Sequence, residues 1–184
     1  MMNRRFFLTG LAALAVAPGI SFAQETPSED AIIRRLDAAP SRRVRPDERV
    51  TIREFKHRRE LRDRAPSIDI QSINFEFGSS QIARSEYRKV RIIANALQRI
   101  TRRRRGARFL IEGHTDAVGS AASNQVLSED RAEALKWVLV EEFGIPERAL
   151  ETVGYGEEYL LVPTEREEWR NRRVTLRRID EFLR

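Results

Sequence analysis

From residue 67 to its end, the 184-residue chain alternates short apolar runs with two long segments of helical periodicity. This alternation limits the possible folds, because strands and amphipathic helices bury their apolar faces against one another. Apolar residues recur every three or four positions in the helical segments, and they cluster or alternate in the short runs. The pattern predicts an α/β two-layer sandwich of order β-α-β-α-β-β, with both helices packed on one face of a mixed four-stranded sheet.

Local signals set the expected ends of these elements. The expected strands cover residues 68–77, 109–111, 152–155 and 174–179, and the expected helices cover 85–102 and 124–143. The first strand has a phase shift near Ser72 and ends at 78–80. The arginines at 102–105 suit the negative end of the first helix. Gly144 fits the C-cap of the second helix, and Pro146 the stop beyond it.

Residues 24–66 have a different composition. Between Ser41 and Arg64 there are ten basic residues, five acidic residues and only five apolar ones. So charged a segment has little apolar surface to bury, which predicts a solvated helix or a flexible arm. Ser28 is placed to cap a short helix that has Ile32, Ile33 and Leu36 on one face. We therefore expect a charged extension or linker over 24–66 and one folded domain over 67–184.

Residues 1–23 are expected to be a signal peptide. Two arginines, Arg4 and Arg5, precede an apolar stretch from Phe6 to Ala17 that is too short for a membrane span, which needs about 20 residues. Ser21-Phe22-Ala23 offers small residues at a cleavage site. The arginine pair resembles a twin-arginine export signal, and an ordinary secretory signal is the alternative. Cleavage predicts a soluble mature protein without a transmembrane segment.

The amino-acid composition excludes several kinds of catalytic and metal site. The chain has no cysteine, which excludes disulfides, a thiolate zinc site, a cysteine nucleophile and a lipid-carrying N-terminal cysteine. Its two histidines, His57 and His114, are far apart, and neither a nucleophile motif nor a paired-carboxylate site is present. We expect no catalytic residue, no metal and no cofactor, and a structural role for His114 at a strand end. Of 34 basic residues, all but three are arginine, which suits carboxylate or phosphate recognition but also follows from a GC-rich genome.

Three segments together resemble one family. They are Ile111–Gly119 (IEGHTDAVG), Asn124 with Leu127–Ala134 (LSEDRAEA), and Asn171–Val174 (NRRV) preceded by Val153–Glu157 (VGYGE). This pattern resembles the OmpA-like peptidoglycan-associated domain of outer-membrane anchor proteins, the Tol-Pal lipoprotein and flagellar stator subunits. The run at 73–79 is similar to the opening strand of that family. The family usually has Gly-Arg-Ala where this chain has Glu167-Glu168-Trp169, so Trp169 is left to pack on the sheet or to line a groove.

The resemblance implies non-covalent binding of peptidoglycan through the diaminopimelate residue of its stem peptide. One carbon of that residue carries both an ammonium and a carboxylate, so a receptor needs a fixed anion and a fixed cation. Asp116 would accept the ammonium, and Arg131 would pair with the carboxylate. Asn124 and Arg172 are further implied ligand residues, and the backbone of Ala117, Val118 and Gly119 completes the implied site.

Each of these residues also has a structural interpretation. Asp116 could cap its loop and Arg131 could face solvent. Asn124 could be the N-cap of its helix, and Arg172 could serve as an ion-pair partner for Asp116.

The expected location is the periplasm, where the protein would be soluble or peripherally associated with the cell wall or outer membrane. An alternative function is an adaptor, in which the basic segment 41–64 binds an envelope protein or anionic lipid while the domain holds the wall. Nucleic-acid binding through that segment fits its charge but conflicts with export, so no nucleic-acid partner is expected. An enzyme acting on peptidoglycan is disfavoured by the missing catalytic groups.

Overall fold

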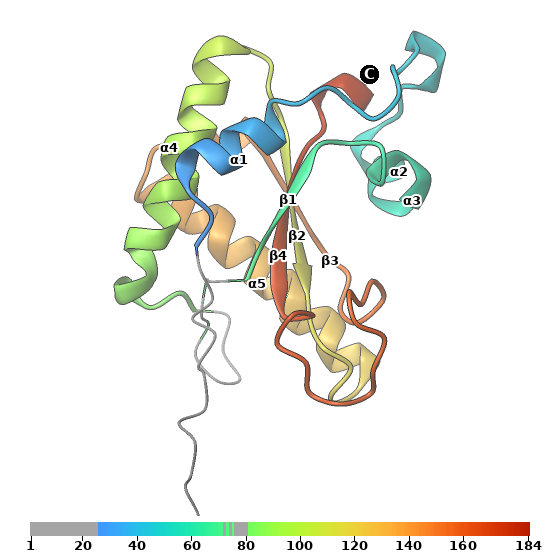
Figure 1. Ribbon diagram of the computed structural model, residues 1–184, viewed down its shortest axis with the longest axis vertical. Coiled ribbons are helices and arrows are strands. Elements are labelled where there is room, and N and C mark those ends of the chain that lie inside the picture. Colours follow the sequence, from blue (N-terminus) through green and yellow to red (C-terminus); the bar gives the residue numbers. More distant parts are fainter. Residues whose placement is uncertain (1–25, 72, 74, 76–80) are drawn as a thin grey trace, which may run out of the picture.

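Four strands form a single mixed sheet in this computed structural model, which describes residues 26–71, 73, 75 and 81–184 (Figure 1). The strands are β1 (Ser67–Ile70), β2 (Phe109–His114), β3 (Leu150–Gly154) and β4 (Arg173–Arg178), in the spatial order β1-β4-β2-β3. Strands β2 and β3 are parallel, and β4 runs antiparallel to both β1 and β2. The predicted mixed four-stranded sheet is confirmed. The predicted signal peptide, 1–23, lies outside the described residues.

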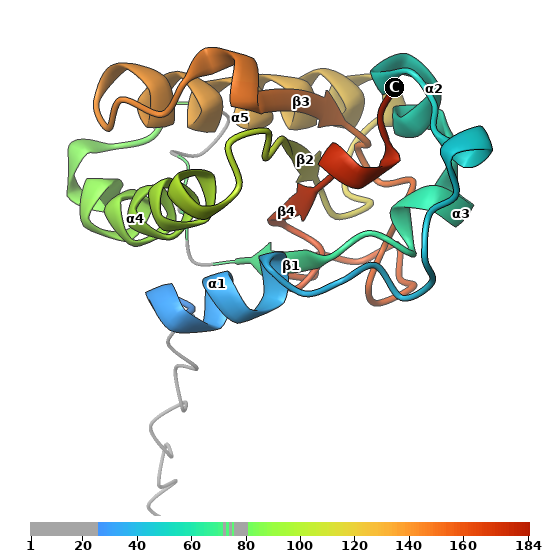
Figure 2. The same cartoon turned by 90° about the horizontal axis from the view of Figure 1, so that it is seen from above.

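Two long helices, α4 (Tyr87–Arg103) and α5 (Ala121–Glu141), cover one face of this sheet. Figure 2 shows both on the same side of the strands. Their apolar positions meet those of the strands in one core, whose fully buried members include Ile32, Val90, Leu97, Ile111, Leu135 and Leu176. The predicted two-layer arrangement is therefore confirmed for α4 and α5. Short 3₁₀ turns cover Pro46–Glu48, Arg84–Glu86, Glu147–Ala149 and Asp180–Phe182.

The first strand is shorter than the sequence predicts. Its ladder with β4 runs from the pair Ser67 and Arg177 to the pair Ile70 and Val174. Strand β4 begins at Arg173, so the partner strand ends almost where β1 does. Beyond it, Phe75 forms an isolated antiparallel bridge with Ile82. The expected strand end at 78–80 lies outside the described residues.

The helix predicted after Ser28 is present as α1 (Glu29–Leu36). The Ser28 hydroxyl accepts a hydrogen bond from the amide of Ala31 at 3.2 Å, which satisfies one of the free donors of the first turn. The apolar face predicted for this helix is buried in the main core beside α4. This part of the extension therefore belongs to the folded body.

The solvated arm expected over 41–64 is wrong. This segment forms α2 (Ile52–His57) and α3 (Arg59–Arg62), which lie on the sheet face opposite α4 and α5 (Figure 2). Its few apolar residues converge on a second core, in which Phe55 packs edge-on against Phe182 with ring centroids 5.4 Å apart. Counting apolar residues underestimated what could be buried, because nearly all of them point to one side.

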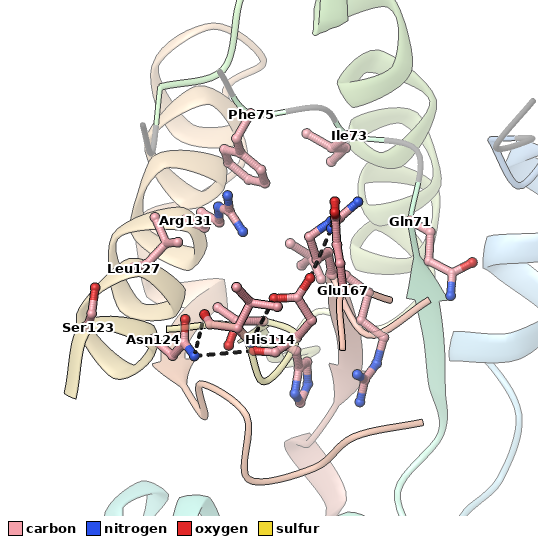
Figure 3. A pocket seen from close by; sticks show the side chains of 15 residues that line it. Gln71, Ile73, Phe75, His114, Ser123, Asn124, Leu127, Arg131 and Glu167 are labelled. Carbon is pink, nitrogen blue, oxygen red and sulfur yellow. Dashed lines mark hydrogen bonds and ion pairs between the residues drawn. The ribbon is translucent and has the colours of Figure 1, made fainter. Parts of the chain in front are cut away.

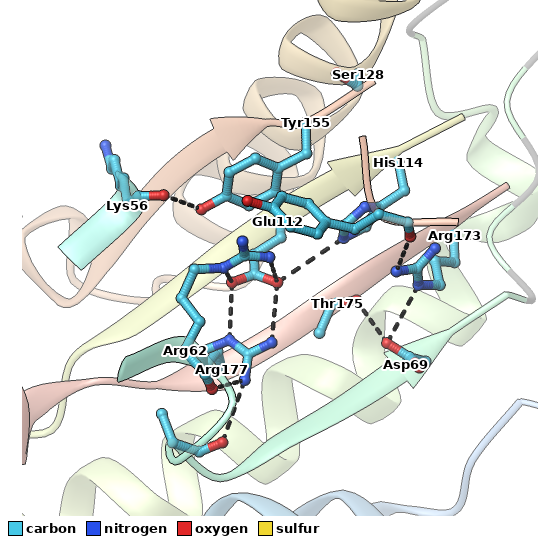
Figure 4. Close-up of polar contacts among 12 residues, drawn as sticks. Lys56, Arg62, Asp69, Glu112, His114, Ser128, Tyr155, Arg173, Thr175 and Arg177 are labelled. Carbon is cyan, nitrogen blue, oxygen red and sulfur yellow. Dashed lines mark hydrogen bonds and ion pairs between the residues drawn. The ribbon is translucent and has the colours of Figure 1, made fainter. Parts of the chain in front are cut away.

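A buried ion cluster further attaches α3 to the sheet (Figure 4). Glu112 of β2 is fully buried and accepts hydrogen bonds from Arg62 Nε at 3.1 Å and from Arg177 Nε at 2.8 Å. A second pair of bonds, from the Nη2 atoms, makes both contacts bidentate. The Arg62 guanidinium also lies 3.8 Å from the ring centroid of Tyr155. Burial alone would raise the pKa of Glu112, but its hydrogen bonds and the two arginines hold that pKa below its usual value.

No helix in the described part of the chain is long and apolar enough to cross a membrane.

Candidate ligand-binding pocket

One pocket opens at the end of the sheet where β2 leads into α5. Its volume is about 620 Å³. The walls come from the loop after β1, the end of β2 with the following loop, the first turns of α5 and the start of β4 (Figure 3). The lining residues are Gln71, Ile73, Phe75, His114, Thr115, Asp116, Val118, Ser123, Asn124, Leu127, Arg131, Glu167, Arg172, Arg173 and Val174.

Asp116 supplies the anion of this pocket. It lies two residues beyond the end of β2, is 7% exposed, and accepts a hydrogen bond from Arg172 Nη1 at 2.9 Å. Arg172 Nη1 also donates to Glu167 at 2.7 Å, so this arginine bridges two carboxylates. The Asp116 side chain accepts a longer bond from the amide of Val118 at 3.4 Å. Asp116 therefore both shapes its loop and pairs with Arg172, as the structural interpretations of these two residues predicted.

Arg131 supplies a cation to the same pocket. It projects from α5 into the pocket, and its guanidinium lies 5.0 Å from the ring centroid of Phe75 (Figure 3). Within the described residues, no carboxylate lies within 4.0 Å of it, and its buried Nε has no hydrogen-bond partner. Burial and the charge of Arg172 lower the pKa of Arg131, whereas Asp116 opposes this effect. The interpretation of Arg131 as a solvent-facing residue is wrong.

Asn124 fixes the loop that carries Asp116. Its side-chain amide donates to the carbonyl oxygens of Asp116 at 3.3 Å and Val118 at 3.2 Å, and to Glu157 Oε2 at 2.6 Å. The alternative role of Asn124 as an N-cap is wrong, because α5 begins earlier than predicted. Its cap is Ser120, whose hydroxyl accepts from the amide of Ser123 at 3.1 Å.

Two glycines let α5 approach the sheet closely enough to form this pocket. Gly113 of β2 and Gly154 of β3 are paired in the parallel ladder, beneath Ser128 of α5. A Cβ atom on Gly113 would lie 2.0 Å from the Ser128 carbonyl oxygen, and one on Gly154 would lie 2.4 Å from the amide nitrogen of Glu129. Larger residues at these positions would displace the helix that carries Asn124 and Arg131.

Two of the lining residues are buried polar groups whose side chains have no hydrogen-bond partner in the described structure. His114 and Thr115 are each 2% exposed, and neither side chain makes a hydrogen bond. His114 Nε2 lies 3.8 Å from a carboxylate oxygen of Glu112, and burial lowers the pKa of the imidazole. His114 thus occupies the strand end expected for a structural residue, between the pocket and the buried ion cluster.

The structure brings together most of the residues predicted for the site. Asp116, Asn124, Arg131, Arg172 and Val118 line one pocket, whereas Ala117 and Gly119 are not among its lining residues. Gly119 instead adopts a positive φ of 104°, which suits the turn before α5.

Sequence reasoning missed Phe75 and Glu167 as pocket residues. The sequence pattern identifies Phe75 only as part of a strand, and Glu167 only as a departure from a family pattern. Trp169, considered for the groove wall, is 40% exposed and does not line the pocket. The acidic sequence around Glu167, close to Arg172, was the available signal for an ion pair.

Comparison with known proteins agrees with the fold and with these motifs. The sequence matches the OmpA family over residues 74–173, more than half of its length. The chain belongs to the OmpA family. Two structures of similar fold are the periplasmic domain of Helicobacter pylori MotB and a putative MotB-like protein of Desulfovibrio vulgaris. The first has a TM-score of 0.52 at 21% identity, covering 61% of this chain and 74% of that one. The second has a TM-score of 0.51 at 25% identity, covering 61% and 71%.

Two relatives from Pseudomonas aeruginosa match this chain over different shares of their own length. The peptidoglycan-associated lipoprotein is 34% identical over 120 residues, which are 64% of this chain and 68% of that protein. Outer membrane porin F is 36% identical over 85 residues, 46% of this chain. The chain spans only 23% of the length of that porin.

Proposed function

We propose that this chain binds peptidoglycan non-covalently, through the diaminopimelate residue of the stem peptide. Membership of the OmpA family and similarity to a peptidoglycan-associated lipoprotein support the polymer as ligand. The charged side chains that line the pocket support diaminopimelate as the residue that is recognised. The proposed role is binding rather than catalysis. In the described part of the chain, no group of three or more potential metal-ligating side chains comes together.

The observation that carries the proposal is that Arg131 has no anionic partner among the described residues. A half-buried guanidinium without an anion is unfavourable in the free protein, since its desolvation is not offset by an ion pair. A ligand carboxylate that enters the pocket would supply the missing partner in a bidentate contact. The Phe75 ring beneath the guanidinium keeps the arginine oriented toward the pocket.

Asp116 is the proposed partner of the ligand ammonium. Its carboxylate already accepts from Arg172, but each oxygen can accept more than one hydrogen bond. The ammonium would therefore bind beside Arg172 or displace it toward Glu167, which Arg172 already contacts. Asn124 and the Val118 backbone would hold Asp116 in place during this exchange. An anion and a cation facing one pocket match a ligand that carries both charges on one carbon.

We also propose that the protein acts in the periplasm after export. The predicted signal at 1–23 and the similarity to a periplasmic domain of MotB support this location. N-terminal sequencing of the protein recovered from the periplasmic fraction should begin at Gln24. Retention of residues 1–23 in a membrane fraction would contradict the proposal.

The adaptor role through 41–64 remains a second candidate. One observation favours it: Arg43 and Arg49 stay exposed and have no carboxylate partner within the described structure. The rest of the segment is folded onto the sheet, so the surface available to a partner is smaller than the sequence indicated.

The test of the main proposal is titration of a diaminopimelate-containing stem peptide against Asp116→Asn and Arg131→Ala. Each substitution leaves one ligand charge unpaired, so each should cost about 2–5 kcal/mol, or at least about 30-fold in affinity. The double variant should lose less than the sum, because both residues act on one zwitterion. Asp130→Ala is the matched control, since Asp130 precedes Arg131 on α5 and is exposed.

Thermal melts on the same variants separate binding from folding. We expect the melting temperatures to stay close to that of the wild type, because both side chains lie at the pocket rather than in the apolar core. Wild-type affinity in Arg131→Ala would refute the proposed contact. A loss of affinity that merely follows a loss of fold would also refute it.

A further inference from the structure

At the end of the molecule opposite the pocket, the C-terminal turns of α1 and α4 lie side by side. Ion pairs fix this arrangement: Arg99 bonds Glu29 at 2.9 Å near the start of α1, and Arg104 bonds Asp37 at 2.8 Å at its end. Figure 1 shows α4 ending and β2 beginning at this end, whereas β2 ends beside α5. The six residues of β2 therefore separate the two ends by about 20 Å.

Four arginines on this end have no carboxylate partner in the described structure. They are Arg34 and Arg35 of α1, Arg102 of α4 and Arg105 of the loop that follows, and all four are exposed. We call these four residues the arginine patch.

The acidic residues near the arginine patch are already paired. Asp37 pairs with Arg103 and Arg104, while Asp180 and Glu181 pair with the buried Arg178. The nearby carboxylates are therefore engaged with other arginines. The positive charge of the arginine patch is left for an external anion.

We propose that the arginine patch binds the surface of an anionic phospholipid bilayer. The patch consists of exposed side chains at the outer ends of two elements, rather than of a pocket. An extended anionic surface suits such a patch, because attraction to a charged bilayer needs no complementary shape. Arginine guanidinium groups also match phosphate oxygens in a bidentate contact.

The position of the patch gives this contact a consequence. Because the patch and the pocket lie at opposite ends of β2, a lipid surface at one end leaves the other end open. The protein can then hold peptidoglycan and a membrane surface at the same time. The lipid contact itself does not depend on the proposed peptidoglycan function.

The test is sedimentation of the full chain with vesicles of phosphatidylglycerol mixed with phosphatidylcholine, against vesicles of phosphatidylcholine alone. Two double variants remove patch charges: Arg34→Gln with Arg35→Gln, and Arg102→Gln with Arg105→Gln. The control, Arg88→Gln with Arg91→Gln, changes net charge equally at exposed positions nearer the start of α4. All chains keep residues 1–23, so any contribution of that apolar stretch is common to them.

We expect each patch variant to bind the anionic vesicles about 25-fold more weakly, from roughly fivefold for each arginine near an anionic surface. The control should lose less than about threefold. Equal losses in the control would overturn the proposal, as net charge alone would then explain binding. Equal binding to both kinds of vesicle, or binding to double-stranded DNA but not to vesicles, would overturn it too.

Two further variants separate this proposal from the other functions. If Arg43→Gln with Arg49→Gln abolishes vesicle binding and the patch variants do not, the lipid contact lies in the segment 41–64 and the proposal fails. Asp116→Asn should lose peptidoglycan and keep wild-type vesicle binding. A parallel loss of both activities in Asp116→Asn would contradict two separate surfaces.

Discussion

Replacing Arg62 with alanine tests whether the N-terminal segment is an integral part of the fold. The Arg62 side chain is 5% exposed and that of Glu112 is 1% exposed, so the pair is shielded from solvent. Removing one partner of a buried ion pair costs about 3–5 kcal/mol. Here Arg177 still holds Glu112 through two hydrogen bonds of 2.8 and 3.1 Å. We therefore expect the low end of that range, about 3 kcal/mol.

The measurement is urea-induced unfolding of the wild type and Arg62→Ala. With a slope of about 2 kcal/mol per molar urea, the midpoint should fall by roughly 1.5 M. Arg59→Ala is the matched control on the same short helix. Its side chain is 71% exposed and lies 3.6 Å from the equally exposed Asp63, so its loss should change the free energy of unfolding by less than about 0.5 kcal/mol.

A second substitution identifies the ion cluster as the cause. Glu112→Gln should be more destabilising than Arg62→Ala, because two buried guanidinium groups then lose their anion together. If the free energy of unfolding of Arg62→Ala lies within about 0.5 kcal/mol of the wild-type value, α3 is not held by this cluster. The segment would then be held mainly by the packing of Phe55 and its apolar neighbours.

Three further predictions concern the pocket and its surroundings. Gly154→Ala should lower both thermal stability and affinity for the stem peptide, because its Cβ would push α5 away from the sheet. The expected loss of stability is about 1–3 kcal/mol. The control is Gly106→Ala, which should leave both properties unchanged because Gly106 has open space around it. Glu167→Gln should lower affinity for a stem peptide by up to about threefold in a calorimetric titration, because Arg172 then has no second carboxylate toward which the ligand ammonium can displace it from Asp116, and an increase in affinity would contradict this. Burial lowers the pKa of His114 in the folded state. As the pH falls below about 6.5, the unfolded chain therefore binds a proton at this histidine before the folded chain does. The free energy of unfolding should consequently fall by at most about 2 kcal/mol from about pH 7 to about pH 5. His114→Gln should remove most of that fall in thermal melts, and an unchanged pH dependence would refute the assignment.

The alternation of apolar runs was sufficient to predict the sheet and its two principal helices. Each helix buries one regular face against strands that are close in sequence, so local periodicity carries the information. The shortened β1 was not predictable in the same way, because its end depends on where β4 begins, about a hundred residues later. The start of α5 was missed for a local reason, since Ser120 rather than Asn124 caps the helix.

The site was predictable as a set of residues but not as a set of contacts. The motifs around Asp116, Arg131 and Arg172 placed three charges near one another. The sequence could not show that Arg172 pairs with Asp116 while Arg131 has no carboxylate partner within the part of the chain that the structure describes. That distinction arises because Arg131 leaves α5 beside Phe75, whereas Arg172 precedes β4 next to the end of β2.

The composition of the segment 41–64 led to a wrong prediction of a solvated arm, for a physical reason that applies to other charged segments. Ten basic residues among twenty-four indicated solvation, but Arg62 is buried because Glu112 on β2 offers a matching buried charge. Nothing near Glu112 in the sequence pointed to such a distant partner. Because His114 lies between Glu112 and the pocket, a change in the packing of α3 can reach the strand end that carries Asp116. We therefore expect Arg62→Ala to weaken stem-peptide binding even at temperatures where the variant is fully folded. Unchanged affinity under those conditions would show that the two sheet faces act independently.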